Sequence, residues 1–350
     1  MAKKPLPPAT IAGRHQVYLE RLKAGYVGKY EDTIRRVDKA VLKVLQDLKA
    51  EKLSELNRAE LKGLLQKLTR EQQELYGKAT EEMMDNFSAL SAAEAGFETT
   101  FLATFTSLEV KEALDAYANA LRSPIQATGE MLEPFVKDLS ARQIKRVEQE
   151  ILKSVSQGRT ISQTVSAVRG TKKRNYQDGV LGRNWEDART VIRTATQHVS
   201  QASREATWMS NSDIVKEYEW VSTLDGKTSS TCKSLDGRHW PVGAGPKPPI
   251  HPRCRSTTTA WFPPSIWAEG ATRSAEFGPV AADQTYFDWL KDQSKEFQVD
   301  ALGPTRAKLF RDGGLSAKEF SDLNLNSNFK PLTLEEMKKL QPNAFNRAGL

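Results

Sequence analysis

The chain has 350 residues, of which 39% are hydrophobic and 27% are charged, and its formal net charge is +7. This balance is typical of a soluble protein with two or three domains, and no apolar run reaches the roughly 18 residues that a membrane-spanning helix needs. The start, MAKKPLPPATIAGRHQ, lacks the apolar core of a secretory signal, and two cysteines exclude a disulfide framework. We therefore expect a protein that is made and folded in a cytosol.

The positive charge is uneven along the chain. Residues 1–50 contain 11 Lys and Arg against 5 Asp and Glu, and residues 151–200 contain 9 against 3. Between them, residues 51–150 contain 12 against 18. Two basic zones around an acidic one fit contact with an anionic partner such as nucleic acid. They fit equally well a solvated surface whose helix faces differ in charge.

The N-terminal region predicts a helical hairpin. A heptad pattern of apolar residues predicts one long helix over residues 15–52, and its members are Tyr30, Ile34, Val37, Val41, Val44 and Leu48. Asn57, with Glu60 three residues later, has the spacing of a capping box and predicts the start of a second helix. The short break favours antiparallel packing. The apolar seam fits either a partner helix in an assembly or the core of the bundle.

Further helices are predicted at residues 103–122 and 139–156, and two short ones within 158–209. Thr160 is the expected N-cap of the first short helix, because Gln163 stands at the capping-box position. The region 1–138 is thus expected to be a helical N-terminal unit.

A basic loop at residues 171–184 is predicted between the two short helices. Its candidate DNA contacts are Lys172, Lys173 and Arg174. Asn184 is expected to open the next helix, with Asp187 in its first turn. That helix has a narrow stripe of small residues, which permits close helix packing, at Ala188, Val191, Ala195, Val199, Ala202 and Ala206.

Residues 215–223 and 254–262 alternate in the manner of strands. Between them lie two LDG turns and a run rich in proline and glycine, so we expect a small antiparallel β element. Helical patterns return afterwards, with capping-box pairs Ser316–Glu319 and Thr333–Glu336.

The predicted fold class is α+β and mainly helical. We expect a long N-terminal helical hairpin or bundle, followed by a helical domain with a small antiparallel sheet. The expected division is an N-terminal region at 1–138, a central domain at 139–264 and a helical tail at 265–350.

The stretch 232–257 contains both cysteines and two of the four histidines. Cys232, His239, His251 and Cys254 follow the pattern C-x6-H-x11-H-x2-C, and these residue types suit tetrahedral zinc. The second half of the pattern has ordinary ligand spacing, whereas the first half is wide.

Three other interpretations of this stretch stay open. Cys232 and His251 could form a catalytic pair oriented by Asp225 or Asp236, although no oxyanion feature is recognisable. Cys232 and Cys254 could form a disulfide in an oxidising environment. They could also be buried free thiols in a rigid β loop whose direction the prolines determine.

Residues 218–258, YEWVSTLDGKTSSTCKSLDGRHWPVGAGPKPPIHPRCRSTT, resemble the signature of the Mu F-like phage head morphogenesis proteins, also called minor head proteins. The segment ARTVIRTATQ is similar to the family's Arg-Thr helix. The positions that carry the resemblance are Arg193, Thr194, Trp220, Asp225, Lys227, Thr228, Ser229, Cys232, Asp236, Gly237, Pro248, Pro249, His251, Pro252, Cys254 and Arg255. Ser229 and Ser256 stand where many members have cysteines, so the resemblance leaves at most a mixed Cys/His metal set.

The resemblance covers residues 140–262 and implies a structural protein of the virion rather than an enzyme. It implies a place in the capsid interior near the portal, with a role in head morphogenesis, DNA packaging and DNA ejection. The implied partners are the portal protein, other head, capsid or ejection proteins and packaged double-stranded DNA, with multiple copies of the chain in a particle. The protein would be made in the cytoplasm of the host bacterium.

The alternative function is a nucleic-acid-binding or nuclease/toxin-type protein that is delivered with the phage genome. Residues 265–350 contain no histidine or cysteine, so the usual general base or metal ligand is missing there. A carboxylate-metal nuclease stays open, but no fitting carboxylate cluster stands out. We expect no enzymatic activity and no cofactor other than zinc.

Overall fold

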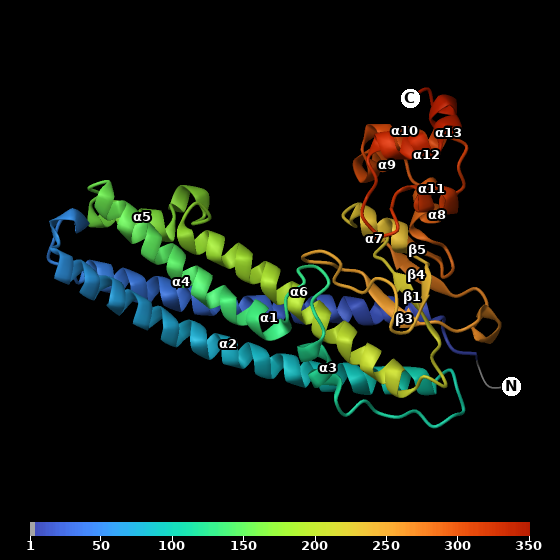
Figure 1. Ribbon diagram of the computed structural model, residues 1–350, viewed down its shortest axis with the longest axis horizontal. Coiled ribbons are helices and arrows are strands. Elements are labelled where there is room, and N and C mark those ends of the chain that lie inside the picture. Colours follow the sequence, from blue (N-terminus) through green and yellow to red (C-terminus); the bar gives the residue numbers. More distant parts are fainter. Residues whose placement is uncertain (1–3) are drawn as a thin grey trace.

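The computed structural model describes residues 4–350, which form a long helical body with a small sheet and a group of short helices at one end (Figure 1). The α-helices are α1 (Pro8–Gln46), α2 (Arg58–Ala103), α3 (Ala116–Arg122), α4 (Leu132–Ser156), α5 (Ile161–Arg169), α6 (Val180–Ser210), α7 (Ser230–Leu235), α8 (Tyr286–Lys291), α9 (Lys295–Leu302), α10 (Pro304–Asp312), α11 (Ala317–Leu323), α12 (Leu334–Leu340) and α13 (Pro342–Arg347). The strands are β1 (Glu217–Val221), β2 (His239–Pro241), β3 (Thr257–Ala260), β4 (Thr272–Ala275) and β5 (Gly278–Ala281). The predicted mainly helical α+β class is confirmed.

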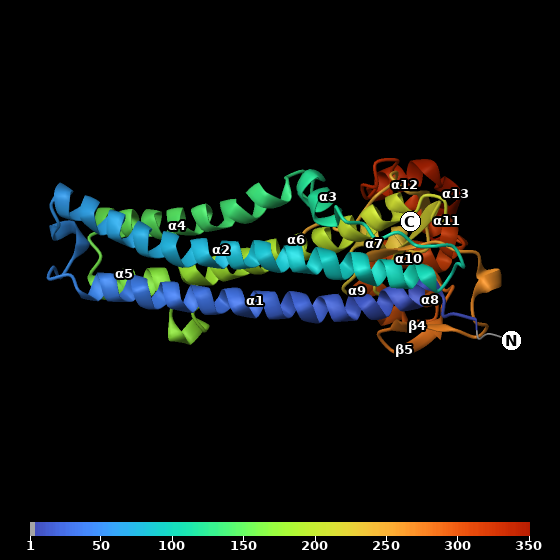
Figure 2. The ribbon, with the colours of Figure 1, turned by 90° about the horizontal axis from the view of Figure 1, so that it is seen from below.

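The predicted N-terminal hairpin is also confirmed. Helix α1 runs from the sheet end of the molecule to the far end, and α2 returns beside it (Figures 1 and 2). The predicted seam of α1 is buried from Tyr30 to Val44, in one hydrophobic core with α2, α4 and α6. The seam therefore packs inside the bundle of this chain.

Helix α6 is the centre of the helical body, because it packs against α1, α2, α3 and α4. The small-residue stripe that the sequence predicts on it is buried throughout. Small side chains in this stripe let a neighbouring helix approach that face of α6 closely.

Each predicted capping box is present. At the start of α2, the Asn57 side chain accepts from the N–H groups of Ala59 and Glu60, and the Glu60 carboxylate accepts from the Asn57 N–H. The same reciprocal pattern begins α5, α11 and α12. These motifs depend only on residues three apart, which is why the sequence predicts them correctly.

Several predicted helix boundaries are wrong. The first helix covers 8–46 rather than 15–52, because Pro8 is suited to the first turn of a helix. The helix predicted at 103–122 is a loop after Ala103 followed by the short α3, and the helix predicted at 139 begins at Leu132. The loop is held by Asn211, whose side chain bonds the backbone of Lys111 in both directions.

The start of α6 also differs from the prediction, since the helix begins at Val180 and not at Asn184. Asn184 is buried inside α6, where its carbonyl accepts from the Gln143 side chain of α4 at 2.8 Å. The preceding loop is closed by Asp178, which accepts from both the N–H and the hydroxyl of Thr171 at 2.7 Å. Gly179 permits this closure, because a Cβ there would lie 2.3 Å from the Gly170 nitrogen. The two predicted short helices are thus one short and one 31-residue helix.

The sheet that the sequence predicts is antiparallel, with strand order β2-β1-β3. Tyr218 pairs with Trp240 of β2 and with Ala260 of β3. A second hairpin, β4-β5, follows in a region that was predicted to be entirely helical. Its residues lack a clear alternating pattern, and β4 packs against α1, where the Thr10 hydroxyl donates to the Thr272 carbonyl at 2.9 Å.

The expected boundary between residues 138 and 139 falls inside α4, whose buried face belongs to the same core as α1 and α2. The helices α8–α13 gather at one end of the molecule (Figure 1). They enclose a separate hydrophobic core that includes Leu224. Within residues 4–350, no helix has the length and apolar character needed to cross a membrane.

Candidate metal-binding centre and its surrounding motif

Three of the four predicted metal ligands lie together beside the sheet. The Cys232 sulfur is 3.2 Å from His251 Nε2 and 3.8 Å from the Cys254 sulfur. All three potential ligand atoms lie within 4.8 Å of one another. Both cysteines are buried free thiols, and His251 is partly buried. The cluster is therefore compact and largely shielded from solvent.

His239 does not join this cluster, which corrects the predicted set of four ligands. It stands in β2 next to Trp240, and successive side chains of a strand point to opposite faces of a sheet. Trp240 packs against the apolar group that contains both cysteines, whereas the His239 ring is exposed and lies 5.2 Å from the Trp261 ring. The wide spacing between Cys232 and His239 was the sequence signal for this difference.

The His251 ring has a defined orientation. Its Nδ1 lies 2.9 Å from the Pro252 carbonyl oxygen, which can only accept a hydrogen bond. Nδ1 therefore carries a proton, and Nε2 is the ring nitrogen that faces the sulfur atoms. A metal-binding histidine typically has this arrangement, with its other nitrogen bonded to a carbonyl or carboxylate.

The thiols of the cluster differ in acidity. Burial opposes ionisation of Cys254, but hydrogen bonds from Cys232 and His251 outweigh it and hold the pKa of Cys254 well below its usual range. Burial and the neighbouring Cys254 raise the pKa of Cys232. Burial would lower the pKa of His251, yet its contact with Cys254 raises it. The two thiols of the cluster are thus shifted in opposite directions.

Thr194 of α6 anchors the turn that contains His251 and Cys254. The Cys254 N–H donates to the His251 carbonyl, and between them Arg253 has a φ of 59°, in the left-handed region. The Arg253 N–H donates to the Thr194 hydroxyl at 3.1 Å, and its guanidinium reaches Thr190. Because left-handed backbone is unfavourable for a side chain such as arginine, these bonds help to fix the turn.

We expect Thr194→Val to lower the free energy of unfolding by about 1–2 kcal/mol, because the Arg253 N–H loses its acceptor. Thr196→Val is the matched control, since Thr196 is equally buried on α6 and its hydroxyl donates to the Ile192 carbonyl of its own helix. Urea denaturation of both variants measures the difference. Equal losses in the two variants would contradict the assigned role of Thr194.

The two LDG turns hold the motif together through their aspartates. Asp225 accepts two hydrogen bonds from the Arg255 guanidinium, at 2.6 and 2.8 Å. Burial would raise the pKa of Asp225, but the paired Arg255 lowers it. This bidentate pair ties the first turn to the residue after Cys254. Asp225 thus has a structural partner in Arg255.

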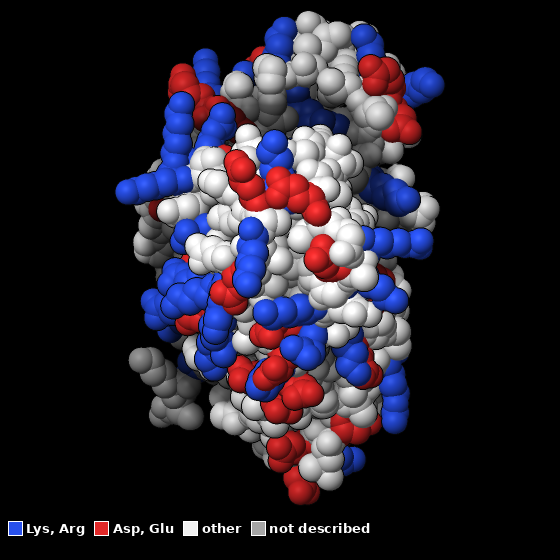
Figure 3. All heavy atoms as spheres, turned by 90° about the vertical axis from the view of Figure 1, so that its left-hand side faces the viewer, with Lys and Arg blue, Asp and Glu red and all other residues white. Residues whose placement is uncertain are grey.

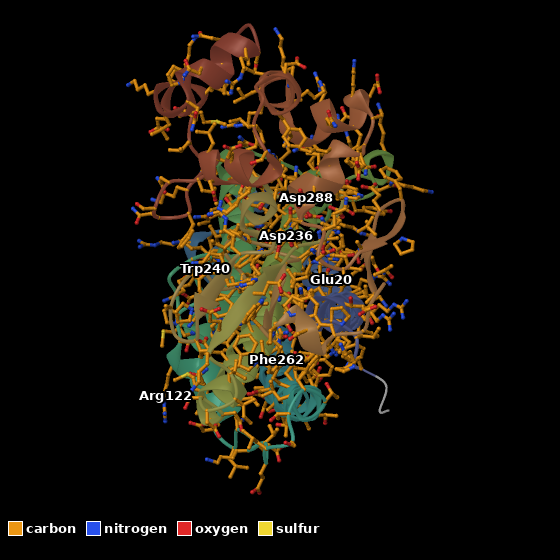
Figure 4. The ribbon with its side chains drawn as sticks, turned by 90° about the vertical axis from the view of Figure 1, so that its right-hand side faces the viewer. Glu20, Arg122, Asp236, Trp240, Phe262 and Asp288 are labelled. Atoms are coloured by element: carbon orange, nitrogen blue, oxygen red, sulfur yellow. The ribbon has the colours of Figure 1, made fainter. Side chains whose placement is uncertain are left out.

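Asp236 of the second turn has a wider set of partners. It accepts from the N–H groups of Ser222 at 2.6 Å and Tyr286 at 2.8 Å, and its oxygens lie 3.1 Å from the Arg273 guanidinium nitrogens. Asp236 lies at the centre of the sheet end of the molecule, below Asp288 of α8 and above Glu20 of α1 (Figure 4). It therefore joins β1, β4 and the start of α8.

The other motif residues also have structural contacts. Trp220 is fully buried, and its carbonyl accepts from the Gly237 N–H at 2.9 Å. Gly237 has a φ of +75°, and a Cβ there would lie 2.8 Å from the Thr285 methyl group. The Thr228 hydroxyl donates to Thr223, and the Ser229 side chain caps α7. Pro248 and Pro249 are buried, Pro252 is exposed, and nothing in the structure explains the exposed Lys227.

A comparison with protein-family models matches residues 145–259 to the family described as phage Mu protein F like protein. This segment is similar to that family, and we refer to residues 145–259 as the Mu F-like domain. The match spans about a third of the 350-residue chain and includes α6, the sheet, the Cys/His cluster and both LDG turns. Comparisons with curated proteins and with solved structures gave no match.

The Mu F-like domain is attached to the N-terminal hairpin by polar contacts that sequence reasoning missed. Arg193 of the family motif pairs with Glu20 of α1, which also binds Lys23 at 2.6 Å. Lys23 is fully buried, and its ammonium group donates to Gln197 of α6. Burial lowers the pKa of Lys23, although Glu20 opposes this. The available sequence signal was that Lys23 stands seven residues before Tyr30, at the heptad position that continues the apolar seam.

A second buried polar group links α2, α6 and β3. Arg204 of α6 donates to the Thr258 carbonyl at 2.9 Å, and its Nε lies 3.7 Å from the Glu94 carboxylate. Glu94 also accepts from Ser200 at 2.6 Å. Glu94 lies 106 positions before Ser200, and Thr258 lies 54 positions after Arg204, so spacing in the sequence could not reveal the group.

The basic loop of the Mu F-like domain lies far from the Cys/His cluster. Lys172, Lys173 and Arg174 form an exposed single turn between α5 and α6, toward the end of the body opposite the sheet (Figure 1). Seen from that end, Lys and Arg side chains gather on one side, with Asp and Glu interspersed (Figure 3). A groove of about 1280 Å³ between α1, α4 and this loop is lined by six basic and five acidic side chains, so its charge is nearly balanced.

Proposed function

We propose that the chain is a minor head protein of a tailed bacteriophage, a non-enzymatic component that acts in head morphogenesis. Its proposed location is the capsid interior near the portal, where it contributes to DNA packaging or ejection in contact with the portal protein and other head proteins. The observation that carries this proposal is the match of residues 145–259 to the phage Mu F-like family. The helical fold by itself would not indicate a function.

The use of the motif residues supports a structural role. Asp225, Asp236 and Thr194 each bind a partner within the chain, and together they join the sheet to α6, β4 and α8. Asp225 and Asp236, which could orient a catalytic histidine, are thus engaged in hydrogen bonds that connect elements of the fold. The long helical body offers an extended surface for contacts with neighbouring subunits of a particle.

Particle composition tests this function. Filled heads of the phage that encodes the chain would be purified on a density gradient, chemically cross-linked and analysed by quantitative mass spectrometry. We expect the chain at a low ratio to the major capsid protein, with cross-links to the portal protein. Heads from which the chain is absent would refute the proposal, and cross-links confined to the outer capsid surface would refute its location.

The basic loop is the proposed contact with packaged DNA. Lys172 and Lys173 are exposed and make no side-chain ion pair within residues 4–350, so both ammonium groups are available to phosphates. The balanced charge of the neighbouring groove favours the loop over the groove as the contact.

Replacing both lysines by glutamate is expected to weaken binding to double-stranded DNA roughly tenfold or more. The slope of log affinity against log salt concentration is expected to become shallower by about 2, because two phosphate contacts are lost. Fluorescence anisotropy at several salt concentrations measures both quantities. Lys62→Glu with Lys67→Glu is the matched control, since these exposed lysines lie in the acidic zone on α2. Equal effects of the two double variants would show a response to net charge alone.

A further inference from the structure

We propose that Cys232, His251 and Cys254 bind one zinc ion, with a water molecule as the fourth ligand. The ion would connect α7 with the proline-rich turn before β3 and so lock the Mu F-like motif. This proposal is independent of the role in the phage head, because it rests on the geometry of the three side chains.

The distance between the sulfur atoms supports a metal over a covalent bond. Two Zn–S bonds of about 2.3 Å at a tetrahedral angle place their sulfur atoms about 3.8 Å apart. The Cys232 and Cys254 sulfur atoms lie 3.8 Å apart, whereas a disulfide requires about 2.05 Å.

The third ligand is oriented for the same ion. His251 Nε2 lies 3.2 Å from the Cys232 sulfur, and the bond from Nδ1 to the Pro252 carbonyl leaves Nε2 as the nitrogen facing both sulfur atoms. The turn of residues 251–254 is anchored to α6 through Thr194, so the ligands are held before an ion arrives. A carbonyl behind a metal-binding histidine and a prearranged turn are both features of built zinc sites.

The surroundings suit a zinc ion bound by two thiolates. Trp220, Leu235 and Leu325 pack around the cysteines, and the ion with two thiolates has no net charge, which reduces the cost of burial. The Ser229 hydroxyl accepts from the Cys232 N–H at 3.2 Å and so fixes the backbone of this ligand. Within residues 4–350, no fourth Cys, His, Asp or Glu side chain belongs to the cluster, which is why we assign water to the last position.

The test is the zinc content of the untagged full-length chain, produced in medium that contains Zn²⁺ and measured by elemental mass spectrometry. We expect about one zinc per chain, and a lower melting temperature after removal by a chelator. Cobalt(II) added to the metal-free chain is expected to give thiolate charge-transfer bands and the intense visible bands of tetrahedral coordination. Wild-type protein without zinc and without these cobalt bands would overturn the proposal.

Variants assign the ligands. Cys254→Ser and His251→Gln are each expected to lower the zinc content per chain at least about tenfold. His239→Gln lies in the same segment but outside the cluster, and it is expected to retain the zinc. Zinc retained in both ligand variants would overturn the assignment. Thiols are also counted in the unfolded wild-type chain. Two reactive thiols without metal would indicate a hydrogen-bonded thiol pair, no reactive thiols would indicate a disulfide, and either result would refute zinc.

Discussion

Asp236→Asn is expected to lower the free energy of unfolding by about 3–5 kcal/mol, the largest effect of a single substitution that we predict. Removing one partner of a buried ion pair leaves the other charge without compensation. The Asp236 side chain is fully buried, and that of Arg273 is 6% exposed. Asparagine keeps the size of the side chain, so the expected loss reflects charge and hydrogen bonding rather than a cavity.

The contacts of Asp236 explain why this loss would spread beyond one turn. Its carboxylate accepts from Ser222 at the end of β1, from Arg273 in β4 and from the Tyr286 N–H at the start of α8. An amide has one accepting oxygen, so at least one of these donors would remain unsatisfied. We therefore expect the packing of α8 on the Mu F-like domain to loosen together with the β4-β5 hairpin.

Chemical denaturation followed by circular dichroism measures the loss. Asp32→Asn is the control, because the Asp32 side chain is 70% exposed and its closest cation, Arg35, lies 3.8 Å away. The double variant Asp236→Asn with Arg273→Gln is expected to lose less than the sum of the two single variants, since it leaves no unpaired charge. A loss below about 1 kcal/mol in Asp236→Asn would contradict the central role of this carboxylate.

Glu98→Gln is expected to stabilise the protein at pH 8 by up to about 3 kcal/mol and to have little effect at pH 5. Burial raises the pKa of Glu98 from 4.5 to about 7, while Arg204 and a hydrogen bond from Trp208 oppose the shift and Glu94 adds to it. Each pKa unit corresponds to about 1.4 kcal/mol of differential stability.

The direction of the effect follows from the raised pKa of Glu98. The folded protein prefers the neutral acid, so this contribution to stability is complete below pH 4.5 and is lost as pH rises through 7. Glutamine stays neutral at every pH, and its oxygen can still accept from Trp208. The variant should therefore escape the destabilisation that the wild-type protein undergoes above pH 7.

Denaturation curves between pH 5 and 8 test this prediction. The wild-type protein should lose stability relative to Glu98→Gln across the range, whereas Glu81→Gln, exposed on the same helix α2, should follow the wild type. A difference between Glu98→Gln and wild type that does not change with pH would show that Glu98 is not the titrating group.

Features that depend on residues close in the sequence were predicted more accurately than features that depend on distant residues. Capping at Asn57, Thr160, Ser316 and Thr333 was predicted correctly, because it depends on residues three positions apart. The start of α6 was predicted wrongly, because Asn184 resembles a cap locally but is bound by Gln143 from another helix. The same distinction applies to the site, where His251 joins the cysteines and His239 does not.

The sequence by itself determined the mainly helical class, the antiparallel sheet, the heptad pattern of α1 and the Mu F-like resemblance. These features reside in short-range periodicity and in the order of residues within one stretch, which need no knowledge of distant partners. Only the tertiary structure decided which histidine faces the cysteines and which charges are buried. Arg204 with Glu94, and Asp236 with Arg273, meet across many residues, and such contacts depend on how helices and strands pack rather than on spacing along the chain.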